Sequence, residues 1–335
     1  MTIRIRRLDP REGQVLRAWW EVGRAASAER PIELFWSWPR AREAVTTPRD
    51  DVITLVLGAF WGPTLVGSGR VTLPQLDNRH LANAEIFVHP DHRGRGVGTR
   101  LVEEAEAWAR QGGRSTVIGH VHAPLGIDDA SVRFAAARGY AVATTELTKA
   151  LDLEATEPAW PALEAAAVER HRDYRLVSWE SPTPAEHVEG FCRLRSSLVG
   201  EIPLGELALA PMAWDETRLR AAEERLRGGG ERVFCAAALA RDGELVGFSD
   251  VIVGTDEPGH AEIGATLVLP GHRGHRLGLG LKLLAQRRLR AAYPGCRFLV
   301  TDNAEVNAPM NAVNDRLGYR AVERVLVVQR HLPPD

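Results

Sequence analysis

The sequence predicts an α/β protein in which one mixed domain of strands and helices occurs twice. Residues 92–98 read His-Arg-Gly-Arg-Gly-Val-Gly, and residues 272–278, 180 positions later, read His-Arg-Gly-His-Arg-Leu-Gly. A second landmark repeats at nearly the same distance, because Gly139–Tyr140 and Gly318–Tyr319 lie 179 positions apart. A chain of 335 residues is longer than one typical core, so two domains of ordinary size are expected.

Hydrophobic spacing and turn residues predict the elements of the first half. Apolar residues alternate over 3–8 and recur at helical spacing over 11–28, and the turn at 61–63 separates the two apolar runs of a hairpin. Gly112–Gly113 ends a later helix. The predicted order is a strand at 3–8, helices at 11–28 and 31–46, strands at 52–60, 64–73 and 84–88, a helix at 98–111, a strand at 115–121, a helix at 131–138 and a strand at 141–151.

The second half repeats this order. Asp242–Gly243 between two apolar runs is a strong hairpin signal, and Gly228–Gly230 ends a helix. The predicted order is a strand at 174–179, helices at 184–198 and 214–227, strands at 232–240, 244–253 and 262–269, a helix at 278–292, a strand at 297–301, a helix at 308–317 and a strand at 321–330. Residues 152–172, rich in alanine, glutamate and proline, are expected to form a linker helix between domains at 1–151 and 173–335.

Composition and charge narrow the possible partners. The net charge of -2 gives no sign of the basic face that nucleic-acid binding needs. The three cysteines, Cys192, Cys235 and Cys296, have no metal-ligand spacing, and their odd number suits a reducing compartment. We find no signal-peptide pattern and no stretch long enough to span a membrane. We therefore expect a cytoplasmic monomer or homodimer without nucleic-acid or membrane partners.

Each basic, glycine-rich run lies between a predicted strand and a predicted helix. The run at 92–98 follows the β-like stretch Ile86–Pro90, and the run at 272–278 follows Ala265–Pro270. Free backbone N–H groups at a helix start, the helix dipole and the small size of glycine together make a site for phosphate. The sequence therefore predicts two anion-binding loops.

These loops resemble the signature of the GNAT N-acetyltransferase superfamily, Arg/Gln-x-x-Gly-x-Gly/Ala, placed between a strand and a helix. The matching residues are Arg93, Gly96 and Gly98 in the first half and Arg273 and Gly278 in the second. Arg276 takes the place of the middle glycine in the second half. The similarity covers nearly the whole chain, which indicates a tandem GNAT protein of mycothiol-synthase-like architecture. Residues 272–278 and 301–319 together resemble an actinobacterial branch of such proteins.

The resemblance implies two tandem GNAT domains, each a mixed, mostly antiparallel sheet with splayed central parallel strands, flanked by helices. It implies acetyl-CoA as cosubstrate and no metal. The pyrophosphate would bind the loops, and the pantetheine arm would lie between the strands 84–88 and 115–121, or 262–269 and 297–301. The residues assigned to acetyl-CoA are Val88, Arg93, Gly94, Gly96, Gly98 and Thr99 in the first half, and Val268, Arg273, Gly274, His275, Arg276, Gly278, Asn303 and Asn307 in the second.

In this family a strand glutamate often serves as the catalytic base, and a tyrosine of the last helix often serves as the acid. Glu262, eleven residues before Arg273, has the spacing of the base, and Glu85 is the parallel candidate in the first half. The alternative for Glu262 is a solvated carboxylate at a strand end. Asn314 and Ala135 stand where the acid is expected, and neither can protonate a thiolate.

Other side chains have a structural interpretation beside a functional one. Tyr140 and Tyr319 are expected in the core rather than as acids. The tryptophans Trp19, Trp20, Trp36 and Trp38 are also expected in the core or at a domain interface, with an acceptor pocket as the alternative. His120 and His122 share a strand face without a third ligand, which argues against a metal and leaves a proton-shuttle role open.

We expect an N-acetyltransferase that moves an acetyl group to the amine of a small molecule. Asn307, which would contact pantetheine or cap the last helix, favours catalysis in the C-terminal half, since Asp128 stands at the equivalent place in the N-terminal half. Three alternatives remain. The N-terminal half is catalytic and the C-terminal half structural, the chain is a non-catalytic acyl-CoA sensor or partner module, or the acyl donor differs.

Overall fold

The computed structural model describes residues 2–32, 34–126 and 129–333, which form two compact units. Unit 1 consists of Met1–Thr145, Gly205–Ala210 and Glu323–Asp335, and unit 2 consists of Glu146–Leu204 and Pro211–Val322.

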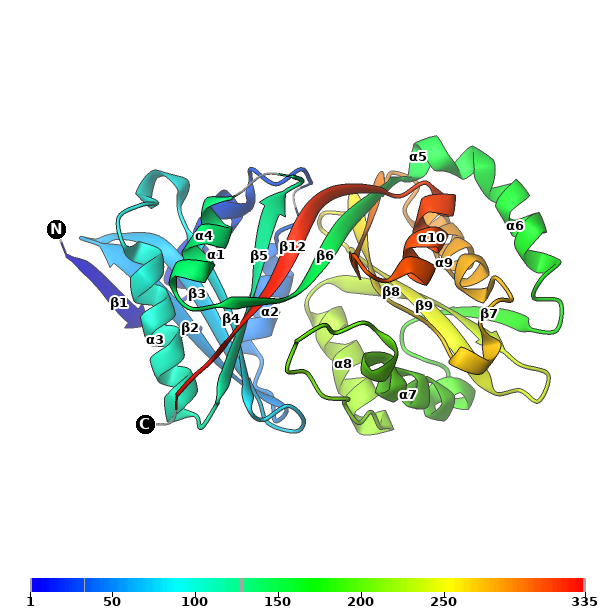
Figure 1. Ribbon diagram of the computed structural model, residues 1–335, viewed down its shortest axis with the longest axis horizontal. Coiled ribbons are helices and arrows are strands. Elements are labelled where there is room, and N and C mark those ends of the chain that lie inside the picture. The colour runs from blue at the N-terminus through cyan, green and yellow to red at the C-terminus, as the bar shows by residue number, and fades with distance from the viewer. Residues whose placement is uncertain (1, 33, 127–128, 334–335) are drawn as a thin grey trace. The chain divides into compact units, whose positions relative to one another are not determined.

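The sheet of unit 1 has the strand order β1-β2-β3-β4-β5-β12, and every pair but β4–β5 is antiparallel (Figure 1). Its elements are β1 (Ile3–Arg7), α1 (Gly13–Ser27), α2 (Trp38–Thr46), β2 (Val52–Trp61), β3 (Thr64–Pro74), β4 (Leu81–Val88), α3 (Val97–Gln111), β5 (Thr116–Pro124), α4 (Ala130–Ala137) and the start of β6 (Ala141–Asp152). Helix α3 covers one face through Val97, Leu101 and Ala105. Helix α1 covers the other face through Trp19 and Trp20.

The sheet of unit 2 has the order β6-β11-β10-β9-β8-β7, with β10–β11 parallel. Its elements are α5 (Leu153–Thr156), α6 (Trp160–Val168), β7 (Arg175–Glu180), α7 (Val188–Ser197), α8 (Glu216–Gly228), β8 (Glu231–Leu239), β9 (Leu245–Gly254), β10 (His260–Val268), α9 (Leu277–Ala292), β11 (Phe298–Ala304), α10 (Ala308–Leu317) and the start of β12 (Arg320–His331). The core beneath α9 includes Leu281, and Phe191 of α7 belongs to the core on the opposite face.

In both units the central parallel strands separate, and we call the point of separation the splay. β4 is in register with β5 only over Leu81–Asn83, although both strands continue. β10 is in register with β11 only over His260–Glu262. The predicted fold class, a mixed and mostly antiparallel sheet with splayed parallel strands flanked by helices, is confirmed in each half.

Two strands begin in one unit and end in the other. The residues of β6 from Glu146 to Asp152 pair with β11 of unit 2. The residues of β12 from Glu323 to His331 pair with β5 of unit 1. The units therefore differ from the contiguous segments 1–151 and 173–335 expected from the sequence, because each sheet contains the last strand of the other half.

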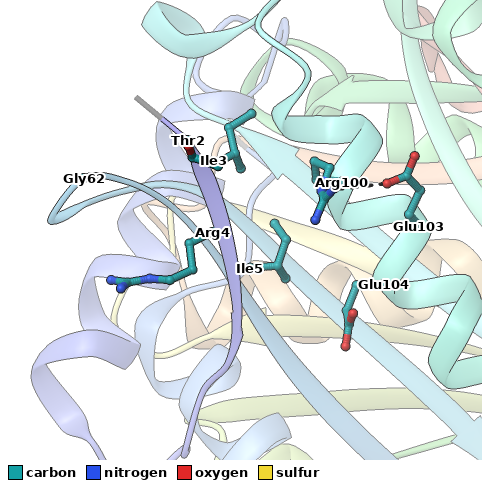
Figure 2. A pocket seen from close by; sticks show the side chains of 8 residues that line it. All are labelled: Thr2, Ile3, Arg4, Ile5, Gly62, Arg100, Glu103 and Glu104. Atoms are coloured by element: carbon teal, nitrogen blue, oxygen red, sulfur yellow. Dashed lines mark ion pairs between the residues drawn. The ribbon is translucent and has the colours of Figure 1, made fainter.

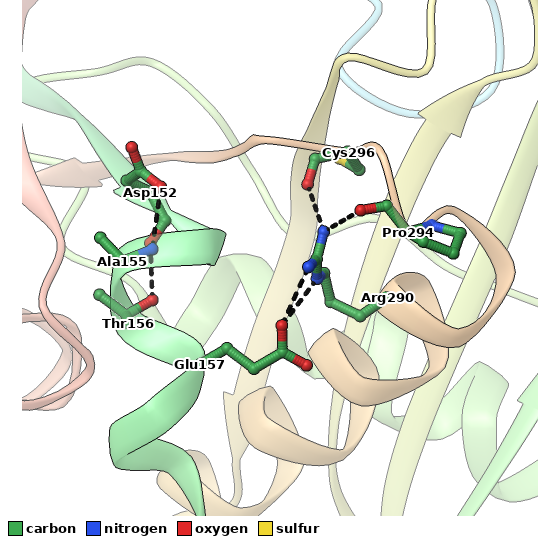
Figure 3. A network of polar contacts seen from close by, with 7 residues as sticks. All are labelled: Asp152, Ala155, Thr156, Glu157, Arg290, Pro294 and Cys296. Carbon is green, nitrogen blue, oxygen red and sulfur yellow. Dashed lines mark hydrogen bonds and ion pairs between the residues drawn. The ribbon is translucent and has the colours of Figure 1, made fainter.

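The segment 152–172, expected as a linker helix, folds into unit 2. Trp160 of this segment is completely buried in the core beneath α9. Arg290 of α9 donates from Nε and Nη2 to Glu157 Oε2, at 3.1 and 2.9 Å, and from Nη1 to the carbonyl of Cys296 at 3.0 Å (Figure 3). The arginine thus connects the segment to α9 and to the turn that precedes β11.

One predicted helix is shorter than expected. The stretch 31–46 is helical only from Trp38 onward, as α2. Ser37 caps this helix, because its side chain accepts a hydrogen bond from the backbone N–H of Arg40 at 3.4 Å. Pro39 follows at the start of the helix, where a missing N–H costs nothing.

Candidate functional site

The splay of unit 2 opens its sheet beside a carboxylate. Glu262 is the last residue of β10 in register with β11, opposite Val300. The register of β10 with β9 then shifts at Gly264, which forms a β-bulge. Ala261 belongs to the core beneath α9, and side chains of a strand alternate, so Glu262 lies on the α7 face. Bulges of this kind re-aim a strand and are common beside active sites.

The loop between β10 and α9 presents free backbone N–H groups. Gly274 and Arg276 have left-handed backbone, with φ of 85° and 56°, and no side chain caps α9. The first N–H groups of a helix lack an intrahelical partner, which leaves those of residues 277–279 available. A Cβ at Gly274 would meet nothing within 4 Å, and one at Gly278 would meet Val313 at 3.9 Å. The loop has both the donors and the room that a phosphate needs.

The arginines of this loop hold it to the protein. Arg273 donates from Nε to the carbonyl of Val268 at 3.0 Å and from Nη2 to Glu201 at 2.6 Å. Arg276 donates from Nη1 to the carbonyl of Ala166 at 2.8 Å, in the last turn of α6. Both guanidinium groups are therefore engaged within unit 2, and the loop's backbone supplies the donors for an anion.

Tyr174 joins the two histidines of the loop. Its hydroxyl lies 3.1 Å from Nδ1 of His272, and its ring centre lies 5.3 Å from that of His275. The expected cofactor residue His275 thus packs against an aromatic side chain beside the loop.

The loop of unit 1 has the same design. Gly94 and Gly96 have φ of 72° and 83°, and α3 has no side-chain cap. Arg93 donates from Nη1 to Glu29 at 3.0 Å, as Arg273 does to Glu201 in unit 2. Gly96, the middle glycine of the signature in unit 1, and Arg276, which replaces it in unit 2, therefore adopt the same left-handed conformation.

Helix α4 closes over the first turn of α3. A Cβ at Gly98 would lie 3.3 Å from the ring of Phe134 and 3.6 Å from the side chain of Val88. Arg138 donates to the hydroxyl of Thr99 beside it. Gly98 has little space for a side chain, which explains why glycine stands here.

Two further carboxylates lie on the α7 face of unit 2. Asp302 is two residues beyond Val300 in β11, and it accepts a hydrogen bond from the Thr148 hydroxyl at 2.5 Å. Glu146 of β6 lies opposite Ala304, two residues farther along β11. Burial and the negative charge of Asp302 raise the pKa of Glu146 to about 7. Glu146 therefore gains and loses a proton near neutral pH.

Sequence reasoning missed Glu146 and Thr148 because they precede the apparent end of the first half. Their strand was expected to finish the N-terminal sheet, whereas these residues pair with β11. The available signal was a carboxylate, Glu146, inside an uncharged β-like run at 141–148.

Glu85 is not the counterpart of Glu262. Asn83 is the last residue of β4 in register with β5, which is the position that Glu262 has in unit 2. Glu85 instead receives two hydrogen bonds from Arg70, at 2.9 and 2.8 Å. The bulge at Gly264 adds one residue to β10, so the repeat distance is 179 before it, from Asn83 to Glu262, and 180 after it, from Val88 to Val268.

Asparagine side chains make hydrogen bonds at both ends of α10, the last helix of unit 2. Of the two roles expected for Asn307, the structure shows the cap, because its Oδ1 accepts from the N–H of Met310 at 3.3 Å. Asn314, at the position of the acid, is fully buried and donates to Oδ1 of Asn303 at 2.5 Å. Asp128, the counterpart of Asn307, lies outside the described residues.

The aromatic residues in question belong largely to the cores. Burial raises the pKa of the Tyr319 hydroxyl, and burial with the charge of Glu106 raises that of Tyr140. Neither phenol is suited to donate a proton near neutral pH. Trp19 and Trp20 of α1 are buried against the sheet, with exposed fractions of 6% and 3%. The core interpretation is confirmed for Tyr319, Trp19 and Trp20, whereas Tyr140 is only partly buried and packs against the core beneath α3.

Other parts of the described chain add little to the site. A hollow in unit 1 lies between β1 and α3, and its lining includes no residue of β4 or β5 (Figure 2). Across residues 2–32, 34–126 and 129–333, no cluster of three or more His, Cys, Asp or Glu side chains could hold a metal ion. In the same ranges no helix is long and apolar enough to cross a membrane.

Comparison with known proteins matches these features. The family model described as Acetyltransferase (GNAT) family matches residues 17–140 and 203–319. A tandem GNAT protein from the clavulanic acid biosynthesis pathway is 26% identical, with a TM-score of 0.82 over 100% of both chains. A GCN5-related N-acetyltransferase from Sphaerobacter thermophilus is 17% identical, with a TM-score of 0.65 over 98% of this chain and 95% of that one.

A putative acetyltransferase from Pyrococcus horikoshii is 13% identical, with a TM-score of 0.58 over 99% of this chain and 90% of that one. No curated protein matches the sequence. Two loops with free N–H groups, two splayed sheets and a family match to both halves lead to one conclusion: this chain belongs to the GNAT acetyltransferase family, in its tandem form.

Proposed function

We propose that this protein transfers an acetyl group from acetyl-CoA to the amine of a small molecule, and that unit 2 carries the reaction. We choose unit 2 because of the β-bulge at Gly264, which follows Glu262 at the point where β10 separates from β11. β4 passes through the equivalent stretch without such a shift. A bulge there makes room for the thioester between the strands and keeps a carboxylate beside it.

The backbone of the unit 2 loop fits the pyrophosphate of the donor. The uncapped start of α9 and the open space above Gly274 support this assignment. Asn303 and Asn307 would line the path of the pantetheine arm at the start of α10. The loop of unit 1, residues 94–99, offers similar donors, so a second acetyl-CoA is accommodated there.

Glu262 then accepts a proton from the ammonium form of the acceptor, because only the neutral amine can attack the thioester carbonyl. The carbon–sulfur bond breaks, the acetyl group stays on nitrogen and the thiolate leaves. The buried Asn314 has no proton to transfer. The thiolate therefore takes the second proton of the amine, directly or through water.

Matched loop variants test the choice of unit. Gly278→Trp places an indole beside Val313, and Gly98→Trp places one at the equivalent loop position of unit 1, where the Phe134 ring must also move. We expect Gly278→Trp to remove most turnover, and Glu262→Gln to lower kcat while leaving the KM for acetyl-CoA unchanged. Calorimetry with acetyl-CoA reports which loop binds. Loss of binding in Gly98→Trp but not in Gly278→Trp would place the donor in unit 1.

A second candidate function is a non-catalytic acyl-CoA-binding module. The observation that favours it is the absence of a tyrosine acid in both halves, where Asn314 and Ala135 stand. This candidate predicts tight binding of acetyl-CoA without release of coenzyme A across a library of primary amines. Release with any one amine would exclude it.

A further inference from the structure

A buried charged group lies beside the splay of unit 1. Glu323 of β12 is 3% exposed and receives Nε of Arg30 at 3.1 Å. On its other side, Nδ1 of His122 lies 3.5 Å from Glu323 Oε1. Burial acts to raise the pKa of Glu323, but the hydrogen bonds from Arg30 and the nearby His122 outweigh it and lower that pKa. An ionised carboxylate is thus held between an imidazole and a guanidinium group.

His122 faces the same side of the sheet as the residues beneath α1. It is four residues beyond Ile118, the last residue of β5 in register with β4, and lies opposite Val325. Side chains alternate along a strand, so His122 shares the face of Ile118 and Asn83. The imidazole therefore stands past the point of separation, as Asp302 and Ala304 do in unit 2.

The residue pair that lies four positions beyond the last parallel pair, which we call the rung, includes a titratable side chain in both units. In unit 1 this rung pairs His122 of β5 with Val325 of β12. In unit 2 the equivalent rung, four residues beyond the last parallel pair, joins Ala304 of β11 to Glu146 of β6. The titratable group lies on the parallel strand β5 in unit 1 and on the neighbouring antiparallel strand β6 in unit 2. Because the two groups are on different strands, duplication of a single residue does not explain them. We infer that this position in the sheet favours a titratable side chain.

We propose that unit 1 holds a second acyl-transfer site, in which His122 accepts the proton of a primary ammonium acceptor and Glu323 positions the imidazole. The proposal uses the acyl-CoA donor of the proposed function and adds a separate centre. Histidine is the usual side chain for proton transfer near neutral pH, and a carboxylate on one ring nitrogen fixes the orientation of the other.

The reaction balances with the groups present. The ammonium transfers one proton to His122, and the neutral nitrogen attacks the thioester carbonyl carbon. A carbon–nitrogen bond forms and the carbon–sulfur bond breaks. The second proton leaves nitrogen for the departing thiolate, and His122 releases its proton to solvent. No oxidant or reductant is involved.

Four proteins separate this centre from that of unit 2: wild type, His122→Gln, Glu262→Gln and the double variant. Thiol release from acetyl-CoA is measured over a panel of primary amines. His331→Gln is the matched control, because His331 of β12 contacts Thr116 at the far end of the strand. We expect Glu262→Gln to retain part of the turnover, and addition of His122→Gln to reduce that remainder at least about 100-fold. His331→Gln should retain it.

The outcomes are distinct. Residual turnover that His122→Gln leaves unchanged overturns the second site and leaves the proposed function of unit 2 standing. Complete loss in His122→Gln with no loss in Glu262→Gln overturns the unit 2 proposal and supports the second site. Absence of thiol release by the wild type with every amine overturns both. Circular dichroism and acetyl-CoA calorimetry establish that each variant is folded.

The positioning role of Glu323 has its own readout. Removing its negative charge in Glu323→Gln favours the neutral imidazole, so the acid limb of the rate profile should move to lower pH. Removing the positive charge in Arg30→Gln should move the limb to higher pH. Structural damage alone lowers kcat in both variants without opposite shifts, and that result would overturn the role of Glu323.

Discussion

The Nζ of Lys282 lies 5.1 Å from the centre of the Tyr319 ring, within the core of unit 2. Both side chains are almost completely buried, and Nζ has no hydrogen-bond partner among the described residues. Burial, with the positive charge of Lys149, lowers the pKa of Lys282 to about 7. The ring face partly offsets the cost of the charged form.

We predict that Lys282→Met is more stable than the wild type at pH 7 and that this advantage shrinks as the pH rises toward 10.5. The unfolded lysine keeps its proton up to about pH 10.5, whereas the folded one loses it above about pH 7. As the pH falls from 10.5 to 7, the free energy of unfolding of the wild type decreases by about 1.4 kcal/mol per pH unit, or by at most about 5 kcal/mol in all. Urea unfolding from pH 6 to 10 measures the difference. A constant gap between the two proteins would contradict the assignment.

We predict that the difference in stability between Glu146→Gln and the wild type changes between pH 4.5 and pH 7. The folded pKa of about 7 exceeds the ordinary 4.5, so the stability that protonated Glu146 contributes is complete below pH 4.5 and is lost as pH rises to 7. The neutral glutamine avoids this loss. We expect the variant to gain on the wild type across this window, by at most about 3 kcal/mol. Urea unfolding at pH 4 to 8 tests it, with Glu305→Gln at an exposed position as the control for the substitution itself.

Arg276 combines a strained backbone with a useful hydrogen bond. Arg276→Ala keeps the left-handed φ of 56° but removes the bond to the Ala166 carbonyl, and should cost about 1 kcal/mol. Arg276→Gly loses the same bond but relieves the backbone, so it should be about 1 kcal/mol more stable than the alanine variant. Thermal unfolding of both proteins measures the difference, and equal losses would show that the backbone is not strained.

Trp160 tests whether 152–172 is structural. Trp160→Ala removes a completely buried indole and should destabilise the protein by about 3–5 kcal/mol, whereas Trp160→Phe should cost less. The segment should also resist limited proteolysis in the wild type. Rapid cleavage within it, or an unchanged melting temperature in Trp160→Ala, would restore the linker interpretation.

The loops could be predicted from sequence because their information is local. Arg93, Gly96 and Gly98 sit within seven residues, and the strand before them and the helix after them follow from simple spacing. The left-handed conformation at Arg276 was not predictable from its side chain. It follows from the place of Arg276 in the repeat, where unit 1 has Gly96.

The site could be predicted only in part because it depends on pairing. The bulge at Gly264 changes the register by one residue, so a constant repeat distance selects the wrong partner for Glu262. The arrival of Glu146 in unit 2 and of Glu323 in unit 1 depends on which strands pair after the chain has turned. Such contacts are 154 residues apart in the case of Thr148 and Asp302, and no local pattern encodes them.

The exchanged strands have a consequence for synthesis. The N-terminal sheet lacks strand β12 until residue 331 has left the ribosome, so the edge of β5 stays open while slightly more than two hundred further residues are made. Exposed edges invite pairing with other chains. A gene cut between the halves would encode two polypeptides that must each borrow a strand from the other. Each half of the chain alone would therefore lack one strand of the sheet to which it contributes most.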